Sequence, residues 1–167
     1  MNTLVLYFSN IVFHLLPETR CFAFKRFLLR LCGAKVGKNV RICSSVKILG
    51  NHELTIGDDS WIGHDTIIIC SAKVAIGENV YIAPRCYIGT GTHEITPDGD
   101  SIAGKGYSLP IVIGDGAWIC ACSTLLAGSV VGAMAIIAAG SVVNGSINSY
   151  ELAGGIPAKH IKPLRTK

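Results

Sequence analysis

Aliphatic residues recur every six positions from the middle of the chain almost to its end. This repeat limits the possible folds more than any other feature. The recurring positions are Val36, Ile42, Ile48 and Leu54, then Ile56, Ile62, Ile68 and Val74, then Ile76, Ile82 and Ile88, and finally Ile113, Ile119, Leu125, Val131, Ile137 and Val143. A period of six fits neither a helix face nor strand alternation, but it fits a triangular coil in which each flat side contributes one inward aliphatic. Stacked coils would pair their short strands at about 4.8 Å, so we expect an all-β parallel β-helix.

The residues between the aliphatic positions predict the corners of this coil. Glycine often follows the aliphatic residue, with Asn or Asp close behind, as in the runs 57–59 and 77–79. These residue types adopt positive φ more readily than others, so we expect them at sharp turns. The interval between Ile88 and Ile113 is too long for the repeat, so residues 94–110 are expected to form one extruded polar loop. Long loops in compact domains are usually functional.

We expect one domain from a chain of 167 residues. Residues 1–33 are interpreted as an N-terminal helical cap, 34–150 as the β-helix, and 151–167 as a C-terminal basic tail. A helix is predicted from Pro17 and Glu18 to Gly33. The apolar side of this helix is formed by Phe24, Phe27, Leu28 and Leu31. The opposite, basic side is formed by Lys25, Arg26 and Arg30. This segment could cap the open end of the β-helix or lie on a membrane surface.

Charge and cysteine content narrow the functional classes. The net charge is +4, and the excess basic residues lie at the two ends of the chain. This distribution suits binding of an anionic cofactor or a membrane surface better than a continuous nucleic-acid-binding surface. None of the seven cysteines forms a C-x-x-C pair. We therefore expect the cysteines to be free thiols of a protein in the reducing cytoplasm. The apolar run from Leu4 to Leu16 is shorter than the roughly 20 residues that span a bilayer. We therefore expect a cytoplasmic protein, with peripheral contact at the inner membrane surface left open.

Five motifs resemble those of the hexapeptide-repeat acyltransferases, particularly the maltose, galactoside and capsular or exopolysaccharide O-acetyltransferases. The motifs are IGENVYIAP at 76–84, TGTH at 90–93, IGDGAWI at 113–119, AAGSVV at 138–143 and AGGIPAK at 153–159. The resemblance runs from about Gly33 to Leu164. It implies a left-handed β-helix, a homotrimer with active sites at subunit interfaces, acetyl-CoA as co-substrate, a sugar acceptor and no metal.

The resemblance also assigns roles to individual residues. His93 would be the general base that deprotonates an acceptor hydroxyl as it attacks the thioester directly, because a neutral imidazole can accept a proton near pH 7. Residues expected to bind the acceptor are His64, Glu94 and Trp118, and those expected to bind CoA are Ala83, Ala121, Ala139, Lys159 and Lys162. The chain departs from the family in lacking an Asn near Gly63 and a Lys near Asn144 and Gly145.

Other functions remain open on the same fold. The acceptor hydroxyl could belong to an antibiotic or an amino acid instead of a sugar. A γ-carbonic-anhydrase-like metalloprotein would need three histidine ligands, and the coils offer only His52, His64 and His93. A non-catalytic β-helix scaffold is a further alternative, since a fold does not fix an activity.

Overall fold

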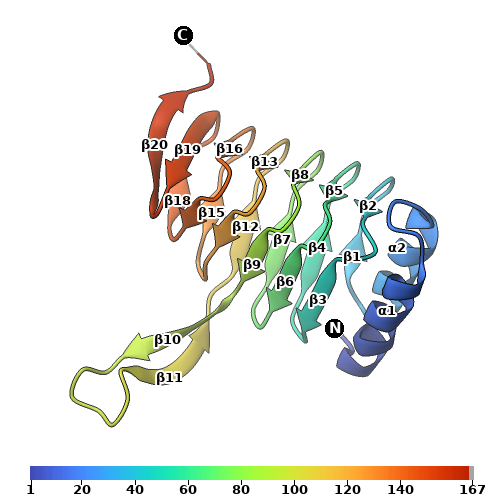
Figure 1. The fold of residues 1–167 in the computed structure, drawn as a ribbon, viewed down its shortest axis with the longest axis horizontal. Coiled ribbons are helices and arrows are strands. Elements are labelled where there is room, and N and C mark those ends of the chain that lie inside the picture. Colours follow the sequence, from blue (N-terminus) through green and yellow to red (C-terminus); the bar gives the residue numbers. More distant parts are fainter. Residues whose placement is uncertain (166–167) are drawn as a thin grey trace.

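Short strands stack into three parallel sheets, which form the sides of a β-solenoid in the computed structural model of residues 1–165 (Figure 1). Sheet A contains β1 (Lys35–Val36), β4 (Leu54–Ile56), β7 (Val74–Ile76), β12 (Ile111–Ile113), β15 (Val130–Val131) and β18 (Ser146–Ile147). Sheet B contains β2 (Arg41–Ile42), β5 (Trp61–Ile62), β8 (Tyr81–Ile82), β13 (Trp118–Ile119), β16 (Ile136–Ile137), β19 (Glu151–Gly155) and β20 (Ala158–Pro163). Sheet C contains β3 (Lys47–Gly50), β6 (Ile67–Cys70), β9 (Tyr87–Gly89), β14 (Thr124–Leu125) and β17 (Val142–Val143).

The register of the strands confirms the six-residue repeat. In sheet B, Ile62 pairs with Ile82, which pairs with Ile119, which in turn pairs with Ile137. Each of these four side chains is 0% exposed. Equivalent buried rows run through sheets A and C, so the inward aliphatics form one continuous column. The predicted parallel β-helix is therefore the observed fold class.

At the corners of the coil, glycine and the Asp or Asn residues that follow it have different roles, although the sequence analysis assigned both to the turn. Asp59 and Asn79 adopt the predicted left-handed conformation, with φ of 59° and 54°. The preceding Gly57 does not have positive φ, but a Cβ there would lie 2.5 Å from the carbonyl carbon of Gly77 in the next coil. Glycine is thus required for close stacking of the coils, while Asp and Asn make the turn.

Two helices, α1 (Thr3–Leu15) and α2 (Phe22–Leu31), cover the first coil. Leu6, Phe13 and Leu29 are at most 2% exposed and join the core of the solenoid. The expected helical cap is present, but the predicted start of its helix at Pro17 is wrong. Residues 17–21 form the link between α1 and α2, because Cys21 adopts a left-handed conformation with φ of 54° and α2 begins only after it.

Two antiparallel hairpins depart from the parallel coils. The expected extruded loop contains β10 (Gly91–Ile95) and β11 (Ala103–Ser108), which project away from the solenoid as a ribbon (Figure 1). At the opposite end from the helices, β19 and β20 pair where a basic tail was expected. Strand pairing orders this segment because β20 extends sheet B; residues 166 and 167 of the expected tail lie outside the described residues. Among residues 1–165, neither helix combines the length and the apolar content needed to cross a membrane.

Candidate active site

His93 lies on β10 of the projecting ribbon, where its imidazole is exposed and held by one hydrogen bond. Its Nδ1 lies 2.9 Å from the main-chain oxygen of Gly104. A carbonyl oxygen can only accept, so Nδ1 carries a proton and Nε2 of the neutral ring is left as an acceptor. His93 pairs across the ribbon with Gly106, where an added Cβ would lie 3.5 Å from the imidazole Cε1. The ribbon therefore fixes the tautomer that a general base needs.

Glu94 follows His93 at an irregularity in the ribbon and is exposed. The acceptor that orients the His93 imidazole is the Gly104 carbonyl and not the Glu94 carboxylate. Glu94 lies beside His93 on the exposed ribbon, and its part in acceptor binding stays a prediction.

A second set of predicted residues shares one edge of the solenoid, at the corner between sheets B and C. Arg85 N–H donates to His64 O at 2.8 Å, Cys122 N–H donates to Pro84 O at 3.0 Å, and Gly140 N–H donates to Ala121 O at 2.9 Å. These bonds stack the corner turns of four successive coils. Residues at matching positions in those turns are His64, Pro84, Ala121 and Ala139, with Ala83 one position earlier in its turn.

The small side chains on this edge leave room for an extended ligand against the backbone. Ala83 and Ala121 are half-buried, and Ala139 is exposed. The edge ends near β20, because Lys159 pairs with Gly154, whose added Cβ would lie 2.9 Å from the Cβ of Ala138. An alanine-lined track with a lysine at one end is suited to a long anionic cofactor such as CoA.

The two lysines predicted to meet CoA phosphates occupy different ends of β20. Lys159 lines a pocket of about 350 Å³ together with Asn144, Gly145 and His160. Lys162 pairs with Leu152 near the other end of the hairpin, and both ammonium groups are on exposed residues. The structure therefore brings Lys159, more directly than Lys162, to the end of the alanine-lined edge.

Trp118 stands on the outward side of sheet B and is 48% exposed. It continues an aromatic row with Tyr81 and Trp61, since Trp118 pairs with Tyr81 and the Trp61 and Tyr81 rings are 5.1 Å apart. Arg41 extends the row, with its guanidinium donating to the Tyr81 hydroxyl at 3.1 Å. Aromatic and guanidinium groups of this kind can pack against a sugar ring or another protein chain.

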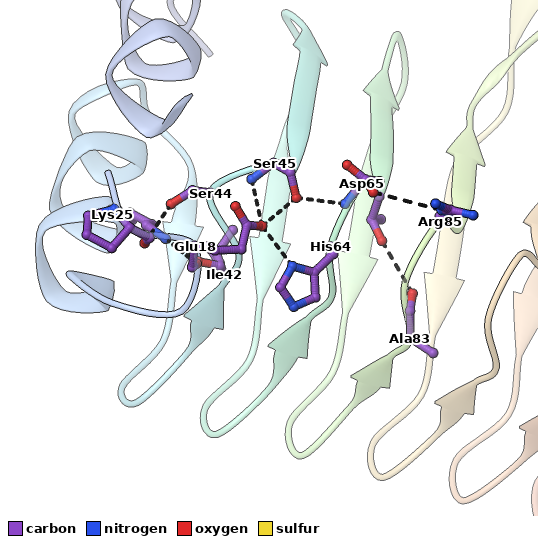
Figure 2. Close-up of polar contacts among 11 residues, drawn as sticks. Glu18, Lys25, Ile42, Ser44, Ser45, His64, Asp65, Ala83 and Arg85 are labelled. Atoms are coloured by element: carbon purple, nitrogen blue, oxygen red, sulfur yellow. Dashed lines mark hydrogen bonds and ion pairs between the residues drawn. The ribbon is translucent and has the colours of Figure 1, made fainter. Parts of the chain in front are cut away.

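His64 takes part in a hydrogen-bond network that sequence reasoning did not find (Figure 2). Its Nδ1 lies 2.9 Å from Oε1 of Glu18, which also accepts from the main-chain N–H and the hydroxyl of Ser45. Partial burial raises the pKa of Glu18, but the hydrogen bonds from Ser45 and His64 outweigh it and hold that pKa below its usual value. The link between α1 and α2 thus positions the His64 ring at the corner.

The buried ammonium group of Lys25 lies next to this network (Figure 2). Lys25 is 0% exposed, and its ammonium donates to Glu18 O at 3.0 Å and to Ile42 O at 2.9 Å. Burial lowers the pKa of Lys25, an effect that the nearby Cys43 and Glu18 oppose. Lys25 therefore ties the helical cap to the first coil through main-chain acceptors.

One group of potential metal ligands lies within residues 1–165: Glu18, Cys43 and His64, whose ligand atoms are all within 4.8 Å of one another. Metal binding there would require the Cys43 thiol to lose a proton, although burial raises the pKa of that thiol. It would also replace the hydrogen bond between His64 and Glu18 and place a cation near Lys25. The three histidines of the carbonic-anhydrase alternative do not form such a group in the chain.

The predicted site residues therefore lie in two separate parts of the molecule. His93 lies on the ribbon that leaves the coil between sheets C and A, whereas His64 and the alanine-lined edge lie between sheets B and C. The ribbon projects away from its own solenoid (Figure 1). Within one chain, His93 and the alanine-lined edge therefore lie on different parts of the molecule.

Comparison with known structures defines the class of protein. A galactoside acetyltransferase solved with coenzyme A has a TM-score of 0.83 and 24% identity, over 98% of this chain and 81% of that chain. A hexapeptide-repeat acetyltransferase from Vibrio cholerae, solved with acetyl coenzyme A, has a TM-score of 0.74 and 25% identity, over 96% and 88%. The fold is that of the hexapeptide-repeat acetyltransferases.

Sequence comparison then gives the family. WcaF of Escherichia coli strain K12, named as a colanic acid biosynthesis acetyltransferase, is 34% identical over 141 residues, which are 84% of this chain and 75% of WcaF. No protein-family model matches the chain. The chain belongs to the hexapeptide-repeat acetyltransferase family.

Proposed function

We propose that the protein transfers the acetyl group of acetyl-CoA to a hydroxyl of a sugar or polysaccharide precursor, with His93 as the general base. The observation that carries the proposal is the hydrogen bond from His93 Nδ1 to Gly104 O, which leaves Nε2 as an acceptor on an exposed ribbon. The name of WcaF, which refers to colanic acid biosynthesis, supports a saccharide acceptor.

The proposed reaction is a direct transfer. Nε2 of His93 takes the proton of the acceptor hydroxyl while the oxygen attacks the thioester carbonyl. The carbon–sulfur bond then breaks, the leaving CoA thiolate takes the proton from Nε2 of His93, and the acetyl ester remains on the acceptor. Such proton transfer contributes about 10²–10⁴-fold to the rates of enzymes that use it.

The proposed active form is a homotrimer with shared sites. The ribbon of one subunit would bring His93 to the alanine-lined edge of a neighbour, where Ala83, Ala121 and Ala139 border CoA and Lys159 meets its phosphates. Lys162 is assigned a secondary phosphate contact, and His64, Glu94 and Trp118 are assigned to the acceptor. The cytoplasm is the proposed compartment, which suits seven cysteines present as free thiols.

An acceptor screen tests the reaction. The wild-type protein is incubated with acetyl-CoA and separate sets of sugars, nucleotide sugars, aminoglycoside or other hydroxylated antibiotics, and serine. We expect CoA release and an acetyl ester, identified by mass spectrometry, only with a saccharide. Acetylation of only an antibiotic or serine would replace the saccharide assignment, and no transfer to any hydroxyl would reject the proposed reaction.

Complementation tests the shared site. The base variant His93→Ala and an edge variant, Ala121→Trp, are each expected to lose activity. If the sites are shared, mixed assemblies of the two variants regain part of the wild-type rate, because some sites combine an intact ribbon with an intact edge. Mixed assemblies without recovery would contradict a site shared between subunits.

A further inference from the structure

The helical cap lies at one end of the solenoid (Figure 1) and presents a surface of large, exposed apolar side chains. We call this surface the cap face; it consists of Leu4, Tyr7, Phe8, Ile11, Leu15, Phe24, Phe27 and Leu31. Leu15 is 80% exposed, Leu4 65% and Phe8 56%. Eight large apolar side chains exposed on two helices that contact each other are unusual on a soluble monomer and mark an interaction site.

Capping of the coil does not account for the cap face. In α1 the buried residues Leu6, Ser9 and Phe13 form one side of the helix, toward the first coil. At about 100° per residue, Leu4, Ile11 and Leu15 lie on the opposite side. The buried side of α1 covers the first coil, and the outward side has no partner among residues 1–165.

The charge around the cap face is strongly positive. Residues 1–50 contain eight lysines and arginines but a single acidic residue, Glu18, whose carboxylate accepts hydrogen bonds from Ser45 and His64. Exposed basic residues in this region include Arg20, Arg30, Lys38, Arg41 and Lys47, whereas Lys35 is paired with Glu53 at 2.9 Å. Exposed apolar side chains together with basic residues of the same cap and of the first coil match the interface of a bilayer that contains anionic lipids.

An apolar groove adjoins the cap face. It has a volume of about 350 Å³ between α1 and β3, and its lining includes Tyr7 and Ile11 of the cap face together with Leu49. Lys47 and His14 also line this groove. The groove gives an acyl chain or a tilted lipid tail space next to basic side chains.

We propose that the cap face docks the protein on the surface of an anionic phospholipid bilayer. Docking would place α1 and α2 in the interface, because neither helix of the described chain has the length and apolar content to cross it. Two copies meeting through the cap face would bring like charges together, whereas anionic headgroups would neutralise them. The inference does not depend on the acetyl acceptor.

Vesicle flotation tests the proposal with the full chain. Vesicles of phosphatidylcholine alone are compared with vesicles that also contain phosphatidylglycerol. Wild-type protein is expected to float with the anionic vesicles and to be released as salt is raised. Phe8→Asp should lower the vesicle partition coefficient at least about tenfold, because it removes a ring that would insert into the bilayer and adds a negative charge.

The matched control is Ile156→Asp, which makes the same change of charge at a residue 76% exposed in the turn at the far end of the solenoid. It should change partitioning less than about twofold, because charge effects fade within a Debye length. Phe8→Leu should keep binding, and thermal unfolding checks that all variants fold. Equal loss in both Asp variants, or no flotation of wild type, would overturn the proposal. A Phe8-dependent change of oligomeric state without flotation would assign the cap face to a second copy.

Discussion

Replacing Gly57 with alanine should destabilise the solenoid by closing the space between two coils. The added Cβ would lie 2.5 Å from Gly77 C, 2.6 Å from Glu78 N and 2.6 Å from Gly77 O, against 3.4–4 Å for ordinary contact. All three atoms belong to the backbone, so a side-chain rotation cannot relieve the clash and the coils must separate by about 1 Å. Overpacking of this kind costs about 1–3 kcal/mol, and we expect about 2 kcal/mol for Gly57→Ala.

Gly145→Ala is the matched control, because nothing lies within 4 Å of its Cβ and its φ is not positive. Alanine at such a position is neutral or stabilises by up to about 1 kcal/mol through the unfolded chain. Urea unfolding at one protein concentration measures both variants, with the midpoint expected to fall for Gly57→Ala at an unchanged slope. Equal midpoints for the two variants would refute the proposed role of glycine in coil stacking.

Two further predictions concern ionisable groups. The pKa of Glu18 is lowered in the folded protein. The ionised Glu18 carboxylate should therefore stabilise the fold fully at pH values above its pKa in the unfolded chain, and this stabilisation should be lost as the pH falls through its pKa in the folded protein. Glu18→Gln should remove this pH-dependent part of the stability. The effect should stay below about 1 kcal/mol since the pair with His64 is partly exposed, and a pH series of unfolding midpoints that is identical in both proteins would contradict it. Burial raises the pKa of Cys70 to about 12 and of Cys86 to about 11, so a thiol reagent at neutral pH should modify the exposed Cys21 and Cys122 before these two buried thiols. Peptide mapping that finds equal early labelling would contradict the buried placement.

The repeat was predictable because one physical requirement recurs at fixed intervals. Ile62, Ile82 and Ile119 each face the same dry column, so their spacing along the chain reports their stacking in space. The ribbon was also predictable as an interruption of that spacing. Its strand pairing was not, since residues 91–108 carry no regular apolar alternation.

Contacts that depend on tertiary structure escaped the sequence analysis. Glu18 meets His64 across 46 positions of sequence, and no local pattern marks such a pair. The orienting acceptor of His93 is the main-chain oxygen of Gly104, a group that every residue possesses. The division of the cap into α1 and α2 depends on the left-handed conformation of Cys21, which its residue type does not favour.

Steady-state acetyl transfer by His93→Ala tests the central claim most directly. The control is His52→Ala, a change at another exposed histidine, whose ring forms a hydrogen bond with the neighbouring Asn51. The acceptor is the saccharide identified by the screen, and ester formation is measured at saturating acetyl-CoA. We predict a fall in kcat of about 10²–10⁴-fold for His93→Ala and near wild-type turnover for His52→Ala. Turnover by folded His93→Ala equal to that of the wild type would contradict the assignment of His93 as the base.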